Sequence, residues 1–553
     1  MPKRVDWPNA LDDIVMLSFA GPMRRQFTLR PRQPGRWRLL VRPVFPLDLR
    51  GVSVFETEIA SGTQLPELFE WEPPQGFERI RDWSWSAIRL ARDLPDLDLE
   101  AGRHRPGRER SKPIDLPLHE RSSLADQLMT PSRLRGRFKL FEVEREPHSF
   151  AMWSCHQPFE GKADEPARII EGTRSILEWY ARRVEEEDID VVYALGDTAY
   201  SDGCPATNFV DEYYSRSGLG TAEGRASLRN AYQDMYRHYW SFDAFQSVQR
   251  SRPHICIWDD HELRDGSGSE AEDFEGDNPA IREAATQVAR AYILDQGPRV
   301  RPARDDRAED AHKAYRYGSV ATFVFDGRSS RAYHGQEGKV VSDQQMADFE
   351  RFCHGVARDE TIRYLCMGTA VPFINLKDFL ERLGSEAPKA LTDLAMGIRD
   401  DVRDSWHSPG NQAQLKDLMA ILRETLDKNE DCTAVNLSGD IHISNAFSFQ
   451  PPGFRRACYQ ITSSALTNRQ HLPGWIGEIF ETGTFDFSEI LGVITRIWTN
   501  ERNPNFLTAR ERDGLLSLRL NVFNAETGEA DPTLDQEFTL GLERFGIRRV
   551  VTA

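Results

Sequence analysis

Residues 191–200 read Val-Val-Tyr-Ala-Leu-Gly-Asp-Thr-Ala-Tyr, and the rest of the chain is organised around them. The apolar run stops abruptly at Gly196 and Asp197, which is typical of a buried strand that ends at the rim of an α/β sheet. Glycine lets the backbone turn sharply there and lets a ligand come close. Asp197 then offers a hard oxygen ligand, although an aspartate in this position more often only caps the next helix. Whether Asp197 binds a metal or only caps a helix depends on which residues lie at the ends of the other predicted strands.

The composition indicates a globular protein with room for more than one domain. The chain has 553 residues, of which 39% are hydrophobic, and its mean hydropathy is -0.56. No apolar run approaches the ~18 residues of a membrane-spanning helix. The net charge of -17 argues against a general nucleic-acid binder, which needs a basic face. A small anionic substrate is still compatible with this charge, because a bound metal reverses the local sign.

Cysteine usage and the first residues bear on the compartment. The seven cysteines are scattered and form no Cys-x-x-Cys pair, which indicates a reducing environment and no disulfide framework. The chain begins Met-Pro-Lys-Arg-Val-Asp-Trp, which is basic but is not followed by an apolar segment, so a secretory signal is not visible. We therefore expect a cytoplasmic protein that makes no membrane contact.

The chain divides into two predicted domains. Residues 1–145 contain short apolar runs, such as 37–41 and 52–55, that are broken by proline and glycine and are typical of β-strands. From residue 146 to residue 553 strands alternate with segments of helical spacing, beginning with a β-α-β unit that predicts a parallel pair with a right-handed crossover. The sequence thus predicts a β-rich N-terminal domain over 1–145 and an α/β domain over 146–553.

Strands of the second domain end in residues that can bind a metal. Because the carboxyl ends of sheet strands meet at one rim, we expect these residues to lie together although they are far apart in sequence. The predicted strand 150–154 leads into Cys155, and the strand that begins at 191 ends in Asp197. The predicted strand 254–258 leads into Asp259, Asp260, His261 and Glu262, and the strand 433–438 leads into Asp440 and His442. Helices are predicted within 165–187, 225–249, 280–294, 343–353 and 412–427, and further strands at 322–325 and 515–522.

Each of these polar residues also has a purely structural explanation. Cys155 alone is more often a small buried thiol, and His442 alone is compatible with a hydrogen-bonded core histidine. These explanations do not account for the repetition, above all for Asp-Asp-His-Glu at 259–262. Adjacent carboxylates repel one another unless a cation or protons neutralise them. A polynuclear metal site explains the whole pattern more simply.

The donor types limit the metals. Carboxylates favour hard cations such as calcium, magnesium or manganese. The thiolate of Cys155 and the phenolate of Tyr200 suit a stronger Lewis acid such as iron, so a mixed site follows if both join Asp197. Two or more metals a few Å apart can clamp a phosphoryl group and generate hydroxide for in-line attack.

Four short motifs follow one another along the chain. They are Ser-Cys155-His-Gln, Gly-Asp197-Thr-Ala-Tyr200-Ser-Asp, Trp-Asp-Asp260-His261-Glu262 and Ser-Gly-Asp440-Ile-His442. Together they resemble the alkaline phosphatase D (PhoD-like) family of the calcineurin-like metallophosphoesterase superfamily. The resemblance extends over about residues 150–466, with weaker blocks at Asp326-Gly-Arg328-Ser-Ser-Arg331 and Asp404-Ser-Trp406. It implies an α/β fold with a four-layer α-β-β-α core, preceded by the β-rich N-terminal domain.

The resemblance also implies a reaction and a role for each residue. The reaction is metal-dependent hydrolysis of phosphodiesters, phosphomonoesters or both, by attack of a metal-bound hydroxide. Iron and calcium are the expected metals, with manganese, magnesium or zinc as alternatives. Asp197 would bridge the metals, Cys155 and Tyr200 would hold iron, Asp260 and Asp440 would hold the hard cation, His261 would contact the phosphate or protonate the leaving oxygen, His442 would ligate or orient, and Arg328 would bind a phosphate oxygen.

The sequence departs from the family pattern and leaves alternatives open. Asp265 stands near the place where family members often carry an asparagine, so we expect Asp265 to join the metal ligands and to change metal preference. Family members are typically exported, and no export signal is visible here. A nuclease of the same superfamily and a non-catalytic protein stabilised by metals are the competing functions. The acidic segment 270–277 is a candidate lid, and neither the substrate nor the oligomeric state can be read from the sequence.

Overall fold

The computed structural model describes most of the chain, with several gaps. The described residues are 5–45, 48–59, 65–90, 132, 134–141, 148–214, 216–268, 275–276, 278–301, 310–331, 338–374, 406, 408, 410–440, 442–467, 484–501 and 503–541. Most of the candidate lid at 270–277, and Asp404 of the weaker family block, lie outside them.

The first large sheet joins segments that are far apart in sequence. Its ten strands run in the order β23-β22-β21-β8-β11-β12-β1-β2-β5, and β24 also pairs with β22. At its centre β8, β11 and β12 are parallel, as are β12 and β1. The bounds are β1 (Ile14–Gly21), β2 (Arg24–Arg30), β5 (Glu67–Trp71), β8 (Ser149–Trp153), β11 (Val191–Leu195), β12 (His254–Ile257), β21 (Asn505–Arg512), β22 (Leu515–Asn524), β23 (Glu529–Ala530) and β24 (Gln536–Leu540).

The second large sheet carries the predicted strands 322–325 and 433–438. Its order is β13-β14-β15-β16-β18-β17-β20-β19, and β14, β15, β16 and β18 are parallel. The bounds are β13 (Lys313–Tyr317), β14 (Val320–Val324), β15 (Tyr364–Thr369), β16 (Thr433–Ser438), β17 (Ser444–Gln450), β18 (Cys458–Thr462), β19 (Thr484–Ser488) and β20 (Gly492–Glu501).

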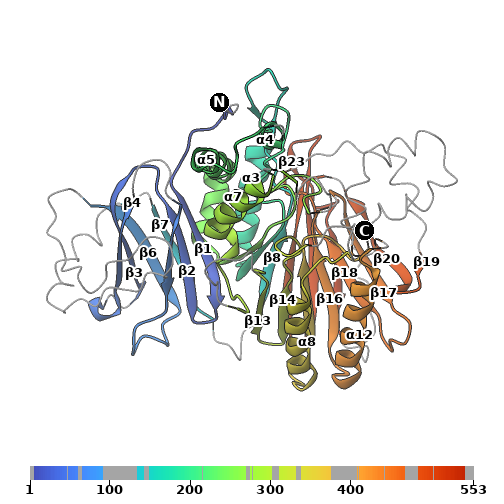
Figure 1. The fold of residues 1–553 in the computed structure, drawn as a ribbon. Helices are drawn as coiled ribbons and strands as arrows, with labels where there is room; N and C mark the ends of the chain where they lie inside the picture. The colour runs from blue at the N-terminus through green and yellow to red at the C-terminus, as the bar shows by residue number, and fades with distance from the viewer. Residues whose placement is uncertain are drawn as a thin grey trace.

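The N-terminal region is β-rich, as the broken apolar runs predicted. A four-stranded sheet in the order β4-β3-β6-β7 lies at one side of the molecule, drawn in blue in Figure 1. Its strands are β3 (Gly35–Pro43), β4 (Ser53–Ile59), β6 (Asp82–Arg89) and β7 (Leu134–Lys139). The other N-terminal strands, β1, β2 and β5, belong to the first large sheet. The domain boundary at residue 145 stays a prediction.

The two large sheets pack on one another, and the alternation along β14 shows how. Val320 and Val324 belong to the same core cluster as Phe150 and Tyr193 of the first sheet. Phe323, which points to the other face because side chains alternate along a strand, belongs to a second cluster with residues of α8 and α12. The strands of the second sheet are therefore apolar on both faces, which is why 320–324 is a continuous apolar run with one threonine.

Helices pack against both large sheets (Figure 1). Helix α3 (Thr173–Glu186) buries Ile176, Leu177, Tyr180 and Val184 at helical spacing, and α8 (Asp343–Ala357) begins at the cap Ser342, whose side chain accepts a hydrogen bond from the Gln345 backbone N–H. The predicted helix 225–249 is two helices, α5 (Ala222–Tyr239) and α6 (Asp243–Ser251). The described residues also form η1 (Leu49–Gly51), α4 (Val210–Tyr214), α7 (Pro279–Ala289), which continues as the π-helical turn η4 (Arg290–Leu294), and α12 (Gln412–Lys428).

The fold is therefore mixed α/β, with several sheets and with helices that contact them. Helix α8 contacts β14 and α12 contacts β16 on the second sheet, whereas α6 contacts β1 of the first. Among the described residues, no helix is both long enough and apolar enough to cross a membrane.

Candidate metal centre

The ends of four strands from both large sheets meet at one place. Backbone hydrogen bonds join them, since the Gly196 N–H donates to Ile257 O (3.1 Å) and the Cys155 N–H to Gly196 O (3.4 Å). Across the sheets, the carbonyl of Ser154 accepts a hydrogen bond from the Leu466 N–H at 2.9 Å. The residue after β16, Gly439, lies directly against Ser154 and the carbonyl of Leu195. The ends of β8, β11, β12 and β16 therefore converge, as predicted.

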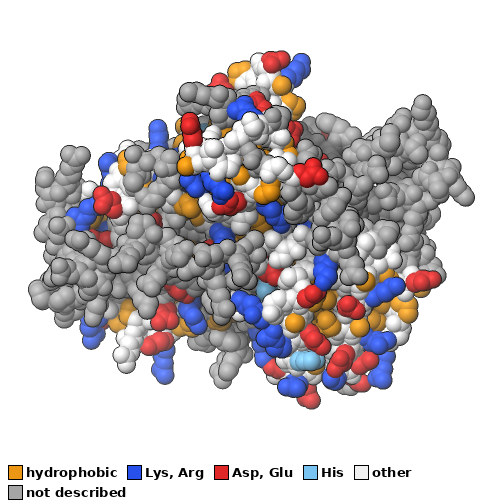
Figure 2. All heavy atoms as spheres, viewed as in Figure 1, with side chains coloured by type: hydrophobic (Ala, Val, Ile, Leu, Met, Phe, Trp, Pro, Cys, Tyr) orange, Lys and Arg blue, Asp and Glu red, His pale blue; other side chains and the backbone are white. Residues whose placement is uncertain are grey.

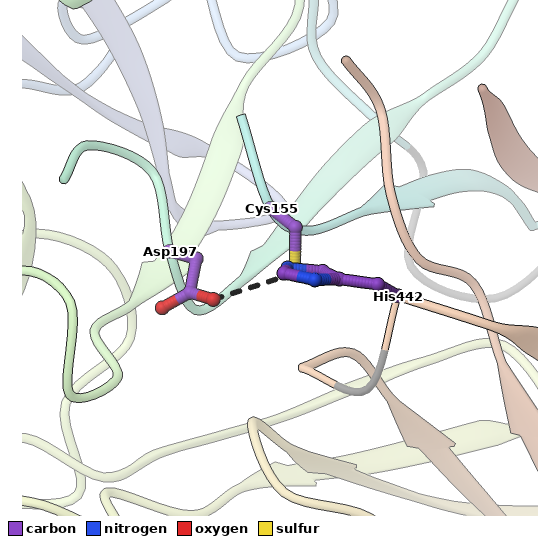
Figure 3. A group of neighbouring side chains, drawn as sticks. All are labelled: Cys155, Asp197 and His442. Carbon is purple, nitrogen blue, oxygen red and sulfur yellow. Dashed lines mark hydrogen bonds between the residues drawn. The ribbon is translucent and has the colours of Figure 1, made fainter. Parts of the chain in front are cut away.

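The first group of side chains consists of Cys155, Asp197 and His442, with Tyr200 beside them. Figure 3 shows the three converging from separate segments of the chain. The Cys155 Sγ lies 3.4 Å from Asp197 Oδ2, and the Tyr200 hydroxyl lies 3.1 Å from the same oxygen and 3.2 Å from His442 Nε2. Potential ligand atoms of Cys155, Asp197 and His442 all lie within 4.8 Å of one another. A thiol, a carboxylate, an imidazole and a phenol therefore face one point.

Two further groups overlap with the first. Asp197 also groups with Asp260 and His261, and Asp260 in turn groups with Asp259 and Asp440, each within the same 4.8 Å limit. Asp197 is thus common to the first and second groups, and Asp260 to the second and third. A shared carboxylate with two oxygens is what a bridge between neighbouring cations requires.

The backbone at these strand ends is held in an uncommon conformation. Cys155, Asp197, Asp440 and His442 have φ values of 55°, 52°, 71° and 53°, in the left-handed region that residues other than glycine seldom adopt. Only two other non-glycine residues in the described part of the chain, Asp188 and Asp513, share this property. Such conformations persist where the surrounding structure imposes them, and they cluster at functional sites.

The buried charge at this centre fits a cation. Asp197 is 1% exposed, and no described residue donates a hydrogen bond to its Oδ1. Burial, together with the charges of Asp260, Asp259 and Glu262, raises the pKa of Asp197 well above its usual value, although His261 opposes this. Burial, with the charge of Asp197, likewise raises the pKa of the Cys155 thiol. A bound cation would satisfy the bare oxygen and favour both deprotonated ligands, so these residues fit a metal.

His261 is held by a residue that the sequence reasoning did not single out. The Asp202 Oδ1 lies 2.8 Å from His261 Nδ1, and the His261 ring packs at a tilt against Tyr200 with a centroid distance of 4.3 Å. Although burial opposes it, the charges of Asp202, Asp197 and Asp260 raise the pKa of His261 well above the usual value. Its side chain is 21% exposed, so it combines a fixed ring with access to solvent. Asp202 is the last residue of the motif Gly-Asp197-Thr-Ala-Tyr200-Ser-Asp, and this position was the one sign in the sequence that it could belong to the centre.

Arg328 and Asp265 occupy different surroundings from those that their predicted roles suggest. Arg328 is 1% exposed, and its guanidinium donates to Asp259 Oδ1 and, at 3.2 Å, to Ser267 O. Asp265 is exposed and is not part of the three ligand groups, while its backbone N–H donates to Asp202. The role of each stays a prediction.

Glu262 joins the ends of β11 and β12. Its carboxylate accepts hydrogen bonds from the backbone N–H groups of Asp197 (3.1 Å), Thr198 (2.5 Å) and Asp259 (2.8 Å) and from the Thr198 hydroxyl (2.7 Å). Burial raises the pKa of Glu262 to about 7, although these hydrogen bonds oppose the shift. The sequence placed Glu262 in the acidic cluster but gave no sign that it binds backbone rather than metal.

Comparison with known proteins assigns the family. The model of the PhoD-like phosphatase family matches residues 150–471, which is more than half of the chain. This chain belongs to the PhoD-like phosphatase family. The match contains every residue of the three ligand groups, and the resemblance proposed from the motifs is confirmed.

One solved structure supports the fold. A structure of PhoD matches with a TM-score of 0.58 and 12% identity, covering 100% of this chain and 94% of that one. Weaker matches include a dimetal phosphatase from Danio rerio, with a TM-score of 0.34 and 10% identity, covering 72% of this chain and 100% of that one. The inner-membrane-complex anchor GAP50 of Plasmodium matches with a TM-score of 0.31 and 11% identity, covering 72% of this chain and 89% of that one. No curated protein matches this chain significantly.

Proposed function

We propose that this PhoD-like family member hydrolyses phosphate esters, as diesters, monoesters or both, in a metal-dependent reaction. The observation that carries the proposal is the set of three overlapping ligand groups, in which Asp197 and Asp260 are each shared. Isolated acidic residues at a strand end would not require such sharing. Membership of the PhoD-like phosphatase family gives the reaction its class.

The donor types suggest which cation each part would hold. Cys155, Tyr200 and Asp197, with His442 beside them, would hold iron, because a thiolate and a phenolate suit a strong Lewis acid. Asp260 and Asp440, with oxygen donors only, would hold calcium; manganese, magnesium or zinc are the alternatives. Cations bound here would neutralise charge on the phosphoryl group and make a water molecule more acidic. Asp265 would be a further metal ligand at the exposed edge of this region.

The histidines have separate tasks in this proposal. The bond between Asp202 and Nδ1 of His261 directs the other ring nitrogen away from that carboxylate. His261 would therefore contact the phosphate through Nε2 or give a proton to the leaving oxygen. His442 would orient the Tyr200 hydroxyl or bind the metal directly, since its Nε2 lies 3.2 Å from that hydroxyl.

We further propose a four-layer α-β-β-α core around the site. The face-to-face packing of the two large sheets and the contacts of α8 and α12 with the second sheet support it. The site would then lie at the strand ends where both sheets meet. This arrangement would let ligands from β8, β11 and β12 combine with those that follow β16.

The substrate is proposed to be a small phosphate ester in a reducing compartment. In the described structure all seven cysteines are free, which supports such a compartment. The face in Figure 2 carries interspersed acidic and basic side chains over its described residues rather than a broad basic surface. Together with the net charge of -17, this favours a small ester over nucleic acid. An active nuclease would instead cleave DNA faster than small esters.

A metal analysis combined with one substitution tests the proposal. We expect the purified protein to contain iron and calcium and to hydrolyse bis-p-nitrophenyl phosphate, p-nitrophenyl phosphate or both. Asp197→Asn should lower the rate by roughly 1,000-fold, because the shared ligand loses its charge. Asp513→Asn is the matched control, since Asp513 also has a positive φ (56°) but lies in the exposed turn between β21 and β22. Equal, measurable rates for wild type and Asp197→Asn would contradict a catalytic role for this centre. No bound metal and no activity in wild type supplied with iron, calcium or manganese would favour the non-catalytic alternative.

A further inference from the structure

Arg328 comes from the segment after a strand of the second sheet, but its side chain contacts residues that follow β12 of the first sheet. It follows β14, is 1% exposed and donates through Nε to Asp259 Oδ1. Its Nη1 donates to Ser267 O at 3.2 Å, and its Nη2 lies 3.4 Å from Asp260 Oδ1. The three nitrogens of the guanidinium thus face two carboxylates and a carbonyl of the segment that follows β12.

The segment around Arg328 is itself fixed. Asp326 is fully buried and accepts hydrogen bonds from the backbone N–H groups of Arg328 (3.2 Å) and Ser329 (3.0 Å). Its Oδ1 also accepts from Trp258 Nε1 at 2.9 Å. The Arg328 carbonyl accepts from Arg282 at 2.6 Å. The guanidinium therefore projects from a rigid base.

A second buried basic side chain adds another connection between the two large sheets. Lys313 of β13 is fully buried, and its Nζ donates to Cys256 O of β12 and to Ile293 O. Lys313, Trp258 and Arg328 thus join β12 and the residues after it to the second sheet at successive positions. Sliding of the two sheets against each other would break all three connections.

Asp260 receives its orientation from both sides. The Gly266 N–H donates to its Oδ2 at 2.8 Å, while Arg328 approaches Oδ1. Asp259 and Asp260 are adjacent and 1% and 3% exposed, so their charges repel one another in a poorly hydrated place. The guanidinium lowers this repulsion and leaves Asp260 directed toward Asp197, His261 and Asp440.

We propose that Arg328 is a positioning residue, which fixes Asp259 and Asp260 for a hard cation and does not contact the phosphate of the substrate. The proposal rests on the proposed function and changes the role that the motif suggested for Arg328. A guanidinium stays positively charged in proteins and can only donate hydrogen bonds. To reach a phosphate, Arg328 would have to leave two buried carboxylates without their counter-charge, which is strongly unfavourable.

Arg328→Lys separates charge from geometry. Lysine keeps the positive charge, but its single ammonium cannot serve Asp259, Asp260 and Ser267 together. We expect calcium alone, measured by equilibrium dialysis of the metal-free protein and by its thermal shift, to bind about tenfold more weakly, as is usual when an outer partner of a metal ligand is lost. At saturating calcium the rate should return to within about threefold of wild type, and the inhibition constant of inorganic phosphate should stay within about twofold.

Two outcomes would overturn the proposal. Unchanged calcium binding with a tenfold higher inhibition constant for phosphate would make Arg328 a substrate contact, and no change in either would remove its role. Arg25→Lys is the matched control, because Arg25 is fully buried and, among the described residues, donates to backbone carbonyls such as Gly21 O and Lys139 O, away from the centre. It should leave calcium binding unchanged.

A second variant keeps the test decisive if Arg328→Lys does not fold. Asp259→Asn removes the partner of Arg328 and should weaken calcium binding to a similar extent, again without changing phosphate inhibition. Where both fold, the double variant should be no weaker than either single one, because the residues act as one pair. Since calcium binding is measured without substrate, an inactive wild type would contradict the proposed function alone, and normal calcium binding by these variants of an active enzyme would contradict this inference alone.

Discussion

At the scale of single residues, the centre is built from side chains that contact one another directly. The Tyr200 hydroxyl illustrates this, because it lies within hydrogen-bond distance of both Asp197 and His442. The ring of Tyr200 packs against His261 and Tyr239. The hydroxyl therefore faces possible metal ligands, whereas the ring contributes packing that does not depend on the hydroxyl.

Tyr200→Phe tests the hydroxyl alone. Because the ring keeps its packing, we expect the free energy of unfolding to change by less than about 1 kcal/mol. Iron content should fall and the esterase rate should drop roughly 10- to 100-fold, since a metal ligand or its immediate partner is lost. Elemental analysis and steady-state kinetics measure these effects. Tyr213→Phe, which removes a hydroxyl bonded to Ser227, should change neither; full iron content in Tyr200→Phe would rule out the phenolate as a ligand.

Glu262→Gln tests the carboxylate that joins two strand ends. Four donors converge on Glu262, and an amide offers one acceptor oxygen in place of two, with N–H groups facing backbone N–H groups. The free energy of unfolding should fall by about 2–4 kcal/mol, measured by urea denaturation. Glu178→Gln, on the exposed face of α3, should stay within about 0.5 kcal/mol of wild type. A Glu262 variant as stable as this control would contradict the assigned role.

At the scale of elements, close approach of the strand ends decides whether the centre can form. Gly439 shows how close the ends of β8, β11 and β16 come. A Cβ added there would meet Ser154 Cβ at 2.4 Å and Leu195 O at 2.7 Å. Only a residue without a side chain lets Asp440 and His442 reach the ligands of the first sheet.

Gly439→Ala should therefore separate the two sheets locally. We expect a loss of about 1–3 kcal/mol in the free energy of unfolding, because the overlap can be relieved only by backbone movement. Metal content should fall as well. Gly327→Ala is the matched control in another strand-end loop, since its nearest neighbour is Val340 Cγ1 at 3.6 Å. Calorimetry and elemental analysis of the two variants should differ clearly; if both behave like wild type, the steric argument is wrong.

At the scale of the whole molecule, the shared core sets the response to acid. His148 precedes β8, is 1% exposed, and lies 3.2 Å from the Tyr315 hydroxyl of the second sheet. Burial lowers its pKa to about 3, from 6.5. Between about pH 6.5 and pH 3 the unfolded chain binds a proton here that the folded chain does not, so stability present above pH 6.5 is lost as the pH falls.

His148→Phe should reduce this loss. The substitution keeps a ring beside Tyr317, whose centroid is 4.6 Å from that of His148, and removes the titrating group. Below pH 6.5 the free energy of unfolding should depend on pH less steeply than in wild type, by up to about 1.4 kcal/mol per pH unit. Denaturation curves at pH 7, 6 and 5 measure the slope. An unchanged slope would show that His148 binds its proton without unfolding.

Much of the architecture was predictable because it depends on local pattern. Strands with continuous apolar runs, such as 191–195, and the helix predicted at 412–427 were placed correctly. The helix predicted within 165–187 begins only at Thr173, because residues 168–169 pair as a short strand with 159–160. The break at Trp240 that divides 225–249 into two helices was not predicted. There the Trp240 indole donates to Thr198 O, a contact with a residue 42 positions earlier that no local pattern encodes.

The sequence by itself determined the chemical types of the ligands and the strand ends that carry them, because each follows from a few neighbouring residues. Family membership follows from the order of those motifs. Only the tertiary structure decided that Asp197 and Asp260 are shared between groups, that Asp202 holds His261, and that Arg328 is buried against Asp259. The physical reason is that hydrogen bonds, burial and electrostatic repulsion act between atoms a few Å apart, and here those atoms belong to strands in two sheets, up to about 300 residues apart in the chain.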